Sequence, residues 1–115
     1  MKDKKNGRPL VYICSRYSGD TDGNAKKARQ YSRFAAECGT IPIAPHLLFP
    51  QFLKEETERD FAMEMDIALL KRCDEVWVFG MESGVSDGMA AEIGNAGSNR
   101  QEVRYFTEDC REAFI

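Results

Sequence analysis

Two carboxylates occupy positions that are unusual for charged residues of a soluble protein. Around Glu92, the neighbours at helical spacing are small or apolar, and Gly88 one turn earlier leaves the space beside the carboxylate free of a side chain. A glycine inside a helix costs about 1 kcal/mol relative to alanine, and room for a ligand would compensate for this cost. We therefore interpret Glu92 as a candidate for chemistry, the alternative being a solvent-facing helix residue.

The second carboxylate, Asp66, lies among apolar residues of the preceding predicted helix. Ala62 is one turn before it, and Leu69 and Leu70 are one turn after it. Burial among such neighbours raises the pKa of a carboxyl group, which suits an acid or a hydrogen-bond partner of a ligand. The alternative is a residue at the edge of the core that contacts a helix N-terminus or an arginine.

Several other polar side chains follow predicted strands or begin a helix. His46 comes directly after the second strand and could stack on a nucleobase or hydrogen-bond to it, although a packed loop histidine is an equal interpretation. Ser15 and Arg16 lie where the first strand meets its loop, a place where phosphate groups bind. Either Ser86 or Asp87 can cap the helix that carries Glu92.

The elements that would position these residues alternate between strands and helices. Strands are expected over residues 10–14, 41–44, 76–79 and 103–106, and helices over about 24–38, 56–72, 86–97 and 108–113. Such alternation predicts a small three-layer Rossmann- or flavodoxin-like α/β sandwich with four or five parallel strands and right-handed crossovers. Ligands of such sheets bind at the carboxyl ends of the strands, which is where the candidate residues would gather.

The helices show apolar faces that should pack on the sheet. The expected core residues of the first helix are Ala28, Tyr31, Ala35 and Cys38, and those of the second are Phe61, Met65, Ala68 and Leu69. Because the sheet is small, we expect a homodimer or higher homo-oligomer that covers an apolar stripe left exposed on the second or third helix.

Length and composition set further limits. The 115 residues suffice for one domain, expected over 9–115 after a flexible tail over 1–8, and the net charge of −3 argues against a nucleic acid polymer or an anionic membrane as partner. The four cysteines form no CxxC pair and there is one histidine, so we expect free thiols and no metal site. Without a signal or spanning segment, the expected location is the cytoplasm. Neither a GxGxxG motif nor a P-loop is present, so no cofactor is expected.

Taken together, these residues resemble the nucleoside 2-deoxyribosyltransferase-like family, which includes the deoxyribonucleoside 5′-monophosphate N-glycosidases and small bacterial and phage relatives. Residues Ser86–Ala96 are similar to the family segment S-x-G-x-x-x-E-x-G-x-A, and Asp66–Asp74 to D-x-x-x-L-x-x-[AC]-D. Val11–Ile13 are similar to the V-Y-[FI] first strand, and His46 takes the place of a histidine in the N-glycosidase branch. The resemblance extends from Val11 to about Phe106.

The resemblance implies hydrolysis or transfer at the N-glycosidic bond of a nucleoside or nucleotide. Glu92 would be the nucleophile, Asp66 would assist departure of the base, and Tyr12, which alone would be assigned to the core, would orient Glu92. The substrate-binding residues would be Ser15, Arg16, His46, Ser86, Gly88 and Met89. Ser86 occupies a position where the transferases tend to carry Asp, which favours a 5′-monophosphate because serine donates to phosphate. The loop after the first strand lacks the glycine-rich character of well-studied members.

A second class of function is consistent with the same residues. A module that binds a nucleotide or a nucleotide-derived signal would keep the site without catalysing turnover. Ligand-induced stabilisation without release of a base would indicate this alternative, and a flat surface at the strand ends would favour a purely structural or partner-binding role.

Overall fold

The computed structural model describes residues 7–113 of the chain. Most of the predicted N-terminal tail therefore lies outside the described residues. Arg8, at the end of that predicted tail, donates from its guanidinium to the carbonyl oxygens of Ala36 at 3.1 Å and Thr40 at 2.9 Å. This residue is thus attached to the end of the first helix.

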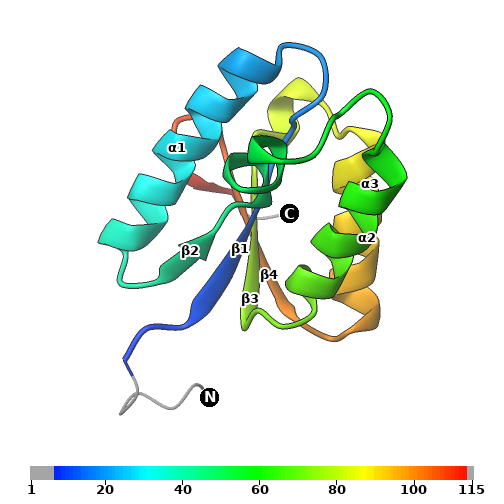
Figure 1. Ribbon diagram of the computed structural model, residues 1–115. Coiled ribbons are helices and arrows are strands. Elements are labelled where there is room, and N and C mark those ends of the chain that lie inside the picture. The colour runs from blue at the N-terminus through cyan, green and yellow to red at the C-terminus, as the bar shows by residue number, and fades with distance from the viewer. Residues whose placement is uncertain (1–6, 114–115) are drawn as a thin grey trace.

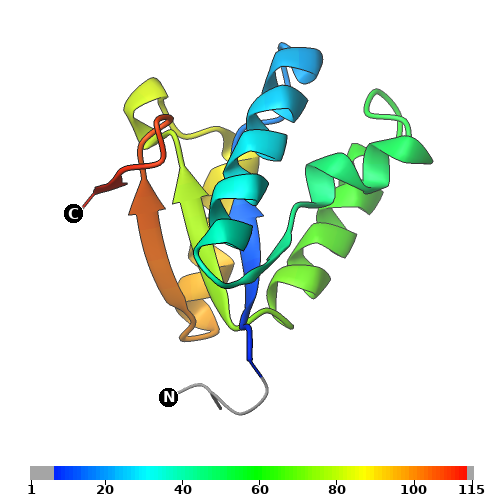
Figure 2. The same cartoon turned by 90° about the vertical axis from the view of Figure 1, so that its left-hand side faces the viewer.

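The described chain forms one five-stranded sheet with helices on both faces. Its elements are β1 (Leu10–Cys14), α1 (Thr21–Glu37), β2 (Ile41–Ile43), η2 (Pro45–Leu47), η3 (Phe49–Gln51), α2 (Arg59–Leu70), β3 (Glu75–Phe79), η4 (Met81–Ser83), α3 (Asp87–Ser98), β4 (Glu102–Phe106) and β5 (Glu112–Ala113). The strand order is β2-β1-β3-β4-β5, in which the first four strands are parallel and β5 is antiparallel to β4. Helix α1 covers one face, and α2 and α3 cover the other (Figures 1 and 2). The predicted three-layer α/β architecture is confirmed.

Alternation along β1 assigns its side chains to two separate core layers. Tyr12 and Cys14 pack on the side of α2 and α3, whereas Val11 and Ile13 pack on the side of α1. All four side chains are buried. The hydroxyl group of Tyr12 is therefore carried into the same layer as Glu92 of α3.

The predicted C-terminal helix over 108–113 is wrong. The hydroxyl oxygen of Thr107 accepts from the backbone N–H groups of Asp109 and Arg111, each at 3.2 Å, and these bonds close a turn. Cys110 then adopts a positive φ of 63°, which a continuing right-handed helix does not allow. The chain leaves this turn as β5, which pairs with β4.

The core face of α2 also differs from the apolar stripe that the sequence predicts. Phe61 is 52% exposed, and Ala68 is exposed as well, whereas Asp66 and Leu70 are buried. Leu69 packs against the core as predicted, whereas Phe61 and Ala68 do not, because a carboxyl group occupies a core-facing position that apolar identity alone does not predict. Cys38, predicted as core, is exposed because it caps the end of α1. The homo-oligomer stays a prediction.

We expect Leu70→Ala to destabilise the protein strongly. Leu70, the last residue of α2, is fully buried against the sheet and α3. Its truncation therefore leaves a cavity, which lowers the free energy of unfolding by about 2–5 kcal/mol. The same substitution at Leu48, which is 52% exposed, should cost about 1 kcal/mol or less. Urea denaturation of both variants measures the difference, and equal losses would contradict this description of the core.

None of the helices among residues 7–113 has the length and apolar character needed to cross a membrane.

Candidate active site

A cleft of about 370 Å³ opens at the carboxyl ends of β1 and β2, between the loop after β1, the η2–η3 segment, α2 and α3. The predicted site residues that line it are Ser15, His46, Asp66, Ser86, Gly88, Met89 and Glu92. Tyr12 lies beneath Glu92 in the core. Arg16 is not part of this cleft, because it lines a neighbouring cavity of about 90 Å³ on the side of α1. The structure therefore brings most of the predicted residues together and leaves Arg16 apart.

The start of α3 is defined by its capping residue. The hydroxyl oxygen of Ser86 accepts from the backbone N–H of Met89 at 3.2 Å, so Ser86 is the cap and Asp87, the other predicted candidate, is the first residue of the helix. At Gly88, a Cβ atom would lie 3.3 Å from the terminal methyl carbon of Met63. The glycine therefore permits close approach of α2 and α3, and Met63 fills part of the space that was expected to be free for a ligand.

Glu92 is held at the inner end of the cleft with only 2% of its surface exposed. The hydroxyl group of Tyr12 donates to Glu92 Oε2 at 2.6 Å. Burial raises the pKa of Glu92 to about 7, although the hydrogen bonds from Tyr12 and Cys14 oppose this rise. Burial also raises the pKa of Tyr12 well above its ordinary value, so the phenol remains a donor at neutral pH.

Asp66 faces the cleft from the middle of α2 and is buried. Burial and, to a smaller extent, the negative charge of Glu55 raise the pKa of its carboxyl group to about 7. At neutral pH the carboxyl groups of Asp66 and Glu92 therefore hold about one proton between them, and their protonation steps belong to the pair.

His46 forms the opposite wall of the cleft. Burial lowers the pKa of its imidazole to about 4, so that this ring is neutral at physiological pH. The ring lies beside Tyr17, with 4.9 Å between the two centroids. Its buried Nδ1 has no hydrogen-bond partner among residues 7–113.

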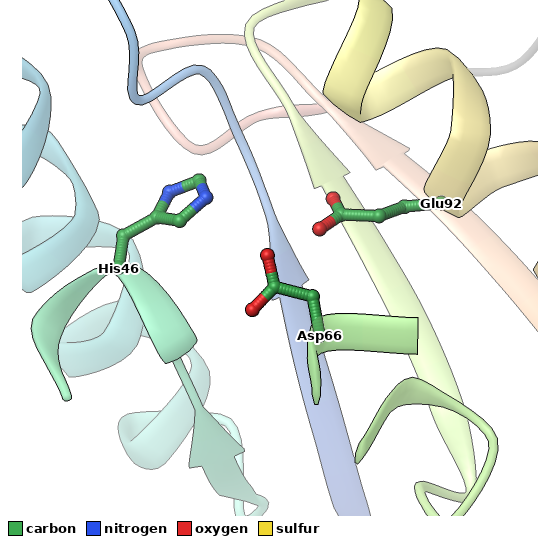
Figure 3. Close-up of side chains that lie close together, drawn as sticks. All are labelled: His46, Asp66 and Glu92. Atoms are coloured by element: carbon green, nitrogen blue, oxygen red, sulfur yellow. The ribbon is translucent and has the colours of Figure 1, made fainter. Parts of the chain in front are cut away.

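The three titratable side chains converge on one point. One ligand atom from each of His46, Asp66 and Glu92 lies within 4.8 Å of the other two. Figure 3 shows the imidazole and both carboxyl groups pointing toward one another, from η2, α2 and α3. Such a group can share and transfer a proton, can place a carboxylate against an electrophilic carbon, and offers donor atoms to a cation.

Part of the cleft wall was not found from the sequence. Tyr17, Ser18, Glu55 and Arg59 line it, and the hydroxyl group of Ser18 donates to Glu55 at 2.8 Å, which links the loop after β1 to the segment before α2. Tyr17 follows β1 closely, as ligand-binding residues of parallel sheets do, and this position was a usable signal. Nothing in the local sequence distinguishes Glu55 from its exposed acidic neighbours.

A family model described as a domain of unknown function, DUF7768, matches residues 9–106. The chain belongs to the DUF7768 family. The matched range of this DUF7768 domain includes every residue that converges on the cleft and ends at the last residue of β4. A search of curated proteins finds no match.

Among solved structures, the DUF7768 chain is similar to a 2-deoxyribosyltransferase from the psychrotolerant bacterium Bacillus psychrosaccharolyticus. The TM-score is 0.65 with 19% sequence identity, and the match covers 92% of this chain and 76% of that chain. That enzyme is described as a biocatalyst for the synthesis of nucleosides. At this level of identity the likeness establishes a shared fold.

Proposed function

We propose that this DUF7768 domain catalyses cleavage or transfer at the N-glycosidic bond of a nucleoside or nucleotide, with Glu92 as nucleophile. The observation that carries the proposal is the pair of buried carboxyl groups in one cleft, with Asp66 and Glu92 oxygens within 4.8 Å of each other. Glycosidases that form a covalent intermediate place their two carboxyl groups about 5–5.5 Å apart, and those that activate a water directly need about 6.5–9.5 Å. The fold shared with a 2-deoxyribosyltransferase supports the same chemistry.

In the first step, a carboxylate oxygen of Glu92 attacks the anomeric carbon while the bond from that carbon to the base nitrogen breaks. The bonding electrons leave with the base, and the base receives the proton of the Asp66 carboxyl group. The oxocarbenium-like transition state is stabilised by the negative charge of Glu92. In the second step, water or another base attacks the glycosyl ester, returns a proton to Asp66 and frees Glu92.

For the substrate we propose a 5′-monophosphate, with the phosphate at the N-terminus of α3. Ser86 lines the cleft there, and because its oxygen accepts from Met89 its hydroxyl hydrogen is free for a phosphate oxygen. Arg16 lies outside the cleft. Its contribution to phosphate binding would require the ligand to reach past Ser15, which lines both cavities.

The test is chromatography of the purified protein with a panel of nucleosides and their 5′-monophosphates, in ribose and 2-deoxyribose forms. Release of free base supports the proposal, and exchange with a second added base identifies a transferase. Thermal stabilisation by a nucleotide with no base released from any substrate would instead indicate a binding module. Preference for the uncharged nucleosides would contradict the phosphate position proposed at α3.

We expect Tyr12→Phe to reduce turnover about 10- to 100-fold, because a hydrogen bond to a charged group contributes about 1.5–3 kcal/mol. Since that bond lowers the pKa of Glu92, its loss should also move the acidic limb of the rate profile to higher pH. Tyr105→Phe, a change on β4 away from the cleft, is the matched control. An unchanged pH profile in Tyr12→Phe would show that the phenol does not act on Glu92.

A further inference from the structure

The point where His46, Asp66 and Glu92 meet has the composition of a metal-binding site. It presents one imidazole nitrogen and two carboxylate oxygens within 4.8 Å of one another. The three side chains come from η2, α2 and α3 and face one another across the cleft (Figure 3). The cleft, with a volume of about 370 Å³, gives an ion and its water ligands access from solvent.

The two carboxyl groups of this site have no cationic partner in the described part of the chain. The ion pairs found among residues 7–113 involve neither Asp66 nor Glu92. Arg59 also lines the cleft, but it lies 3.6 Å from Glu55 and is paired there. A buried carboxylate without a counter-ion is costly, and a cation bound between these two carboxyl groups would offset that cost.

The imidazole of His46 has a buried nitrogen that is available as a ligand. Its Nδ1 makes no hydrogen bond to any residue among 7–113, and a buried polar atom without a partner is unusual in a native protein. Tyr12 donates to Glu92 Oε2, which is the kind of hydrogen bond that orients a metal-bound carboxylate from behind. The imidazole and the two carboxyl groups therefore supply the ligands, and Tyr12 supplies a hydrogen bond that orients one of them.

We infer that His46, Asp66 and Glu92 together bind one Zn²⁺ ion. Imidazole and carboxylate are both zinc ligands, and open zinc sites use three protein ligands with water in the fourth position. At metal–ligand distances of about 2.0–2.2 Å, tetrahedral ligands lie roughly 3.4 Å apart, so the ion draws these side chains together by small rotations. The remaining position faces the cleft.

Occupancy by the ion excludes the glycosyl chemistry proposed above. The ion takes the lone pairs of Glu92 that would attack the sugar, and it takes the Asp66 oxygen that would carry the proton. Zinc therefore acts as a reversible inhibitor of the same site. The binding itself does not depend on the proposed function and is measured without any substrate.

Calorimetric titration of chelator-treated protein with ZnCl₂ tests this inference. The titrations use a Cys38→Ser, Cys110→Ser chain, because Cys38 is exposed and Cys110 is partly exposed, so both could compete for zinc, whereas the other two cysteines are buried. We expect one ion per chain. In this background, His46→Gln and Asp66→Asn should each weaken binding by more than the roughly 10- to 100-fold that loss of an outer hydrogen bond causes. Glu64→Gln, an exposed change on α2, is the matched control and should bind like the parent.

Absence of zinc binding to the parent chain, or equal affinity in all four proteins, would overturn the inference. Circular dichroism shows whether each variant is folded, and His46→Gln decides the question if Asp66→Asn does not fold. Zinc binding without base release from any nucleotide would support the ion site and contradict the proposed function. Base release without zinc binding would support the proposed function and contradict the ion site.

Discussion

Glu92→Gln should abolish release of base from the substrate, with a loss of about 10⁴-fold or more in kcat, the scale seen when a covalent nucleophile is removed from an enzyme. The amide is nearly the same size as the carboxyl group and can still accept from Tyr12, which lies 2.6 Å from Glu92 Oε2. It lacks the negative charge that, under the proposed mechanism, attacks the anomeric carbon and stabilises its positive charge. The loss should therefore fall on kcat and leave substrate binding largely intact.

Two measurements separate this result from general damage to the protein. Intact-mass spectrometry of acid-quenched parent enzyme should detect a glycosyl adduct that is absent from Glu92→Gln. Glu64→Gln removes an exposed carboxylate from α2 and should retain full activity. Undiminished base release by Glu92→Gln, or an adduct on a different residue, would show that another group is the nucleophile.

The sequence was sufficient to predict those features that depend on local patterns. Short runs rich in β-formers predicted the four parallel strands, and a capping serine followed by small residues predicted α3. Since parallel strands end at one edge of a sheet, the convergence of Ser15, His46 and Ser86 followed from topology alone. Such patterns can be recognised from the residue order alone, because side chains repeat about every 3.6 residues along a helix and every two residues along a strand.

The parts that could not be predicted depend on contacts between distant segments. Gly88 suggested empty space beside Glu92, yet Met63 from α2 fills part of it. The buried face of α2 carries Asp66, so a rule that places apolar residues inside selected exposed Phe61 instead. The sequence predicted that His46 and the two carboxyl groups would lie at the same edge of the sheet. Their approach to within 4.8 Å of one another depends on how η2, α2 and α3 pack, which no spacing in the sequence encodes.

Asp66→Asn should lower kcat about 10²- to 10⁴-fold, the usual contribution of a positioned general acid, and should also change the shape of the pH profile. Under the proposed mechanism, the active form carries one proton on the pair, with Glu92 ionised and Asp66 protonated. Burial raises the pKa of each carboxyl group to about 7. The rate should therefore fall below neutral pH as Glu92 gains a proton, and fall above it as Asp66 loses one, which gives a bell-shaped profile.

The asparagine variant has no proton to lose at position 66, so the alkaline limb should disappear while the acidic limb remains. That acidic limb should stay near its position in the parent, because Asp66 is already protonated, and therefore uncharged, in the pH range where Glu92 gains its proton. Rate profiles of Asp66→Asn and of Glu64→Gln, recorded across neutral pH with chelator present, measure both limbs. If the alkaline limb persists in Asp66→Asn, a different group supplies the proton, and the cleft would then need another acid within reach of the departing base.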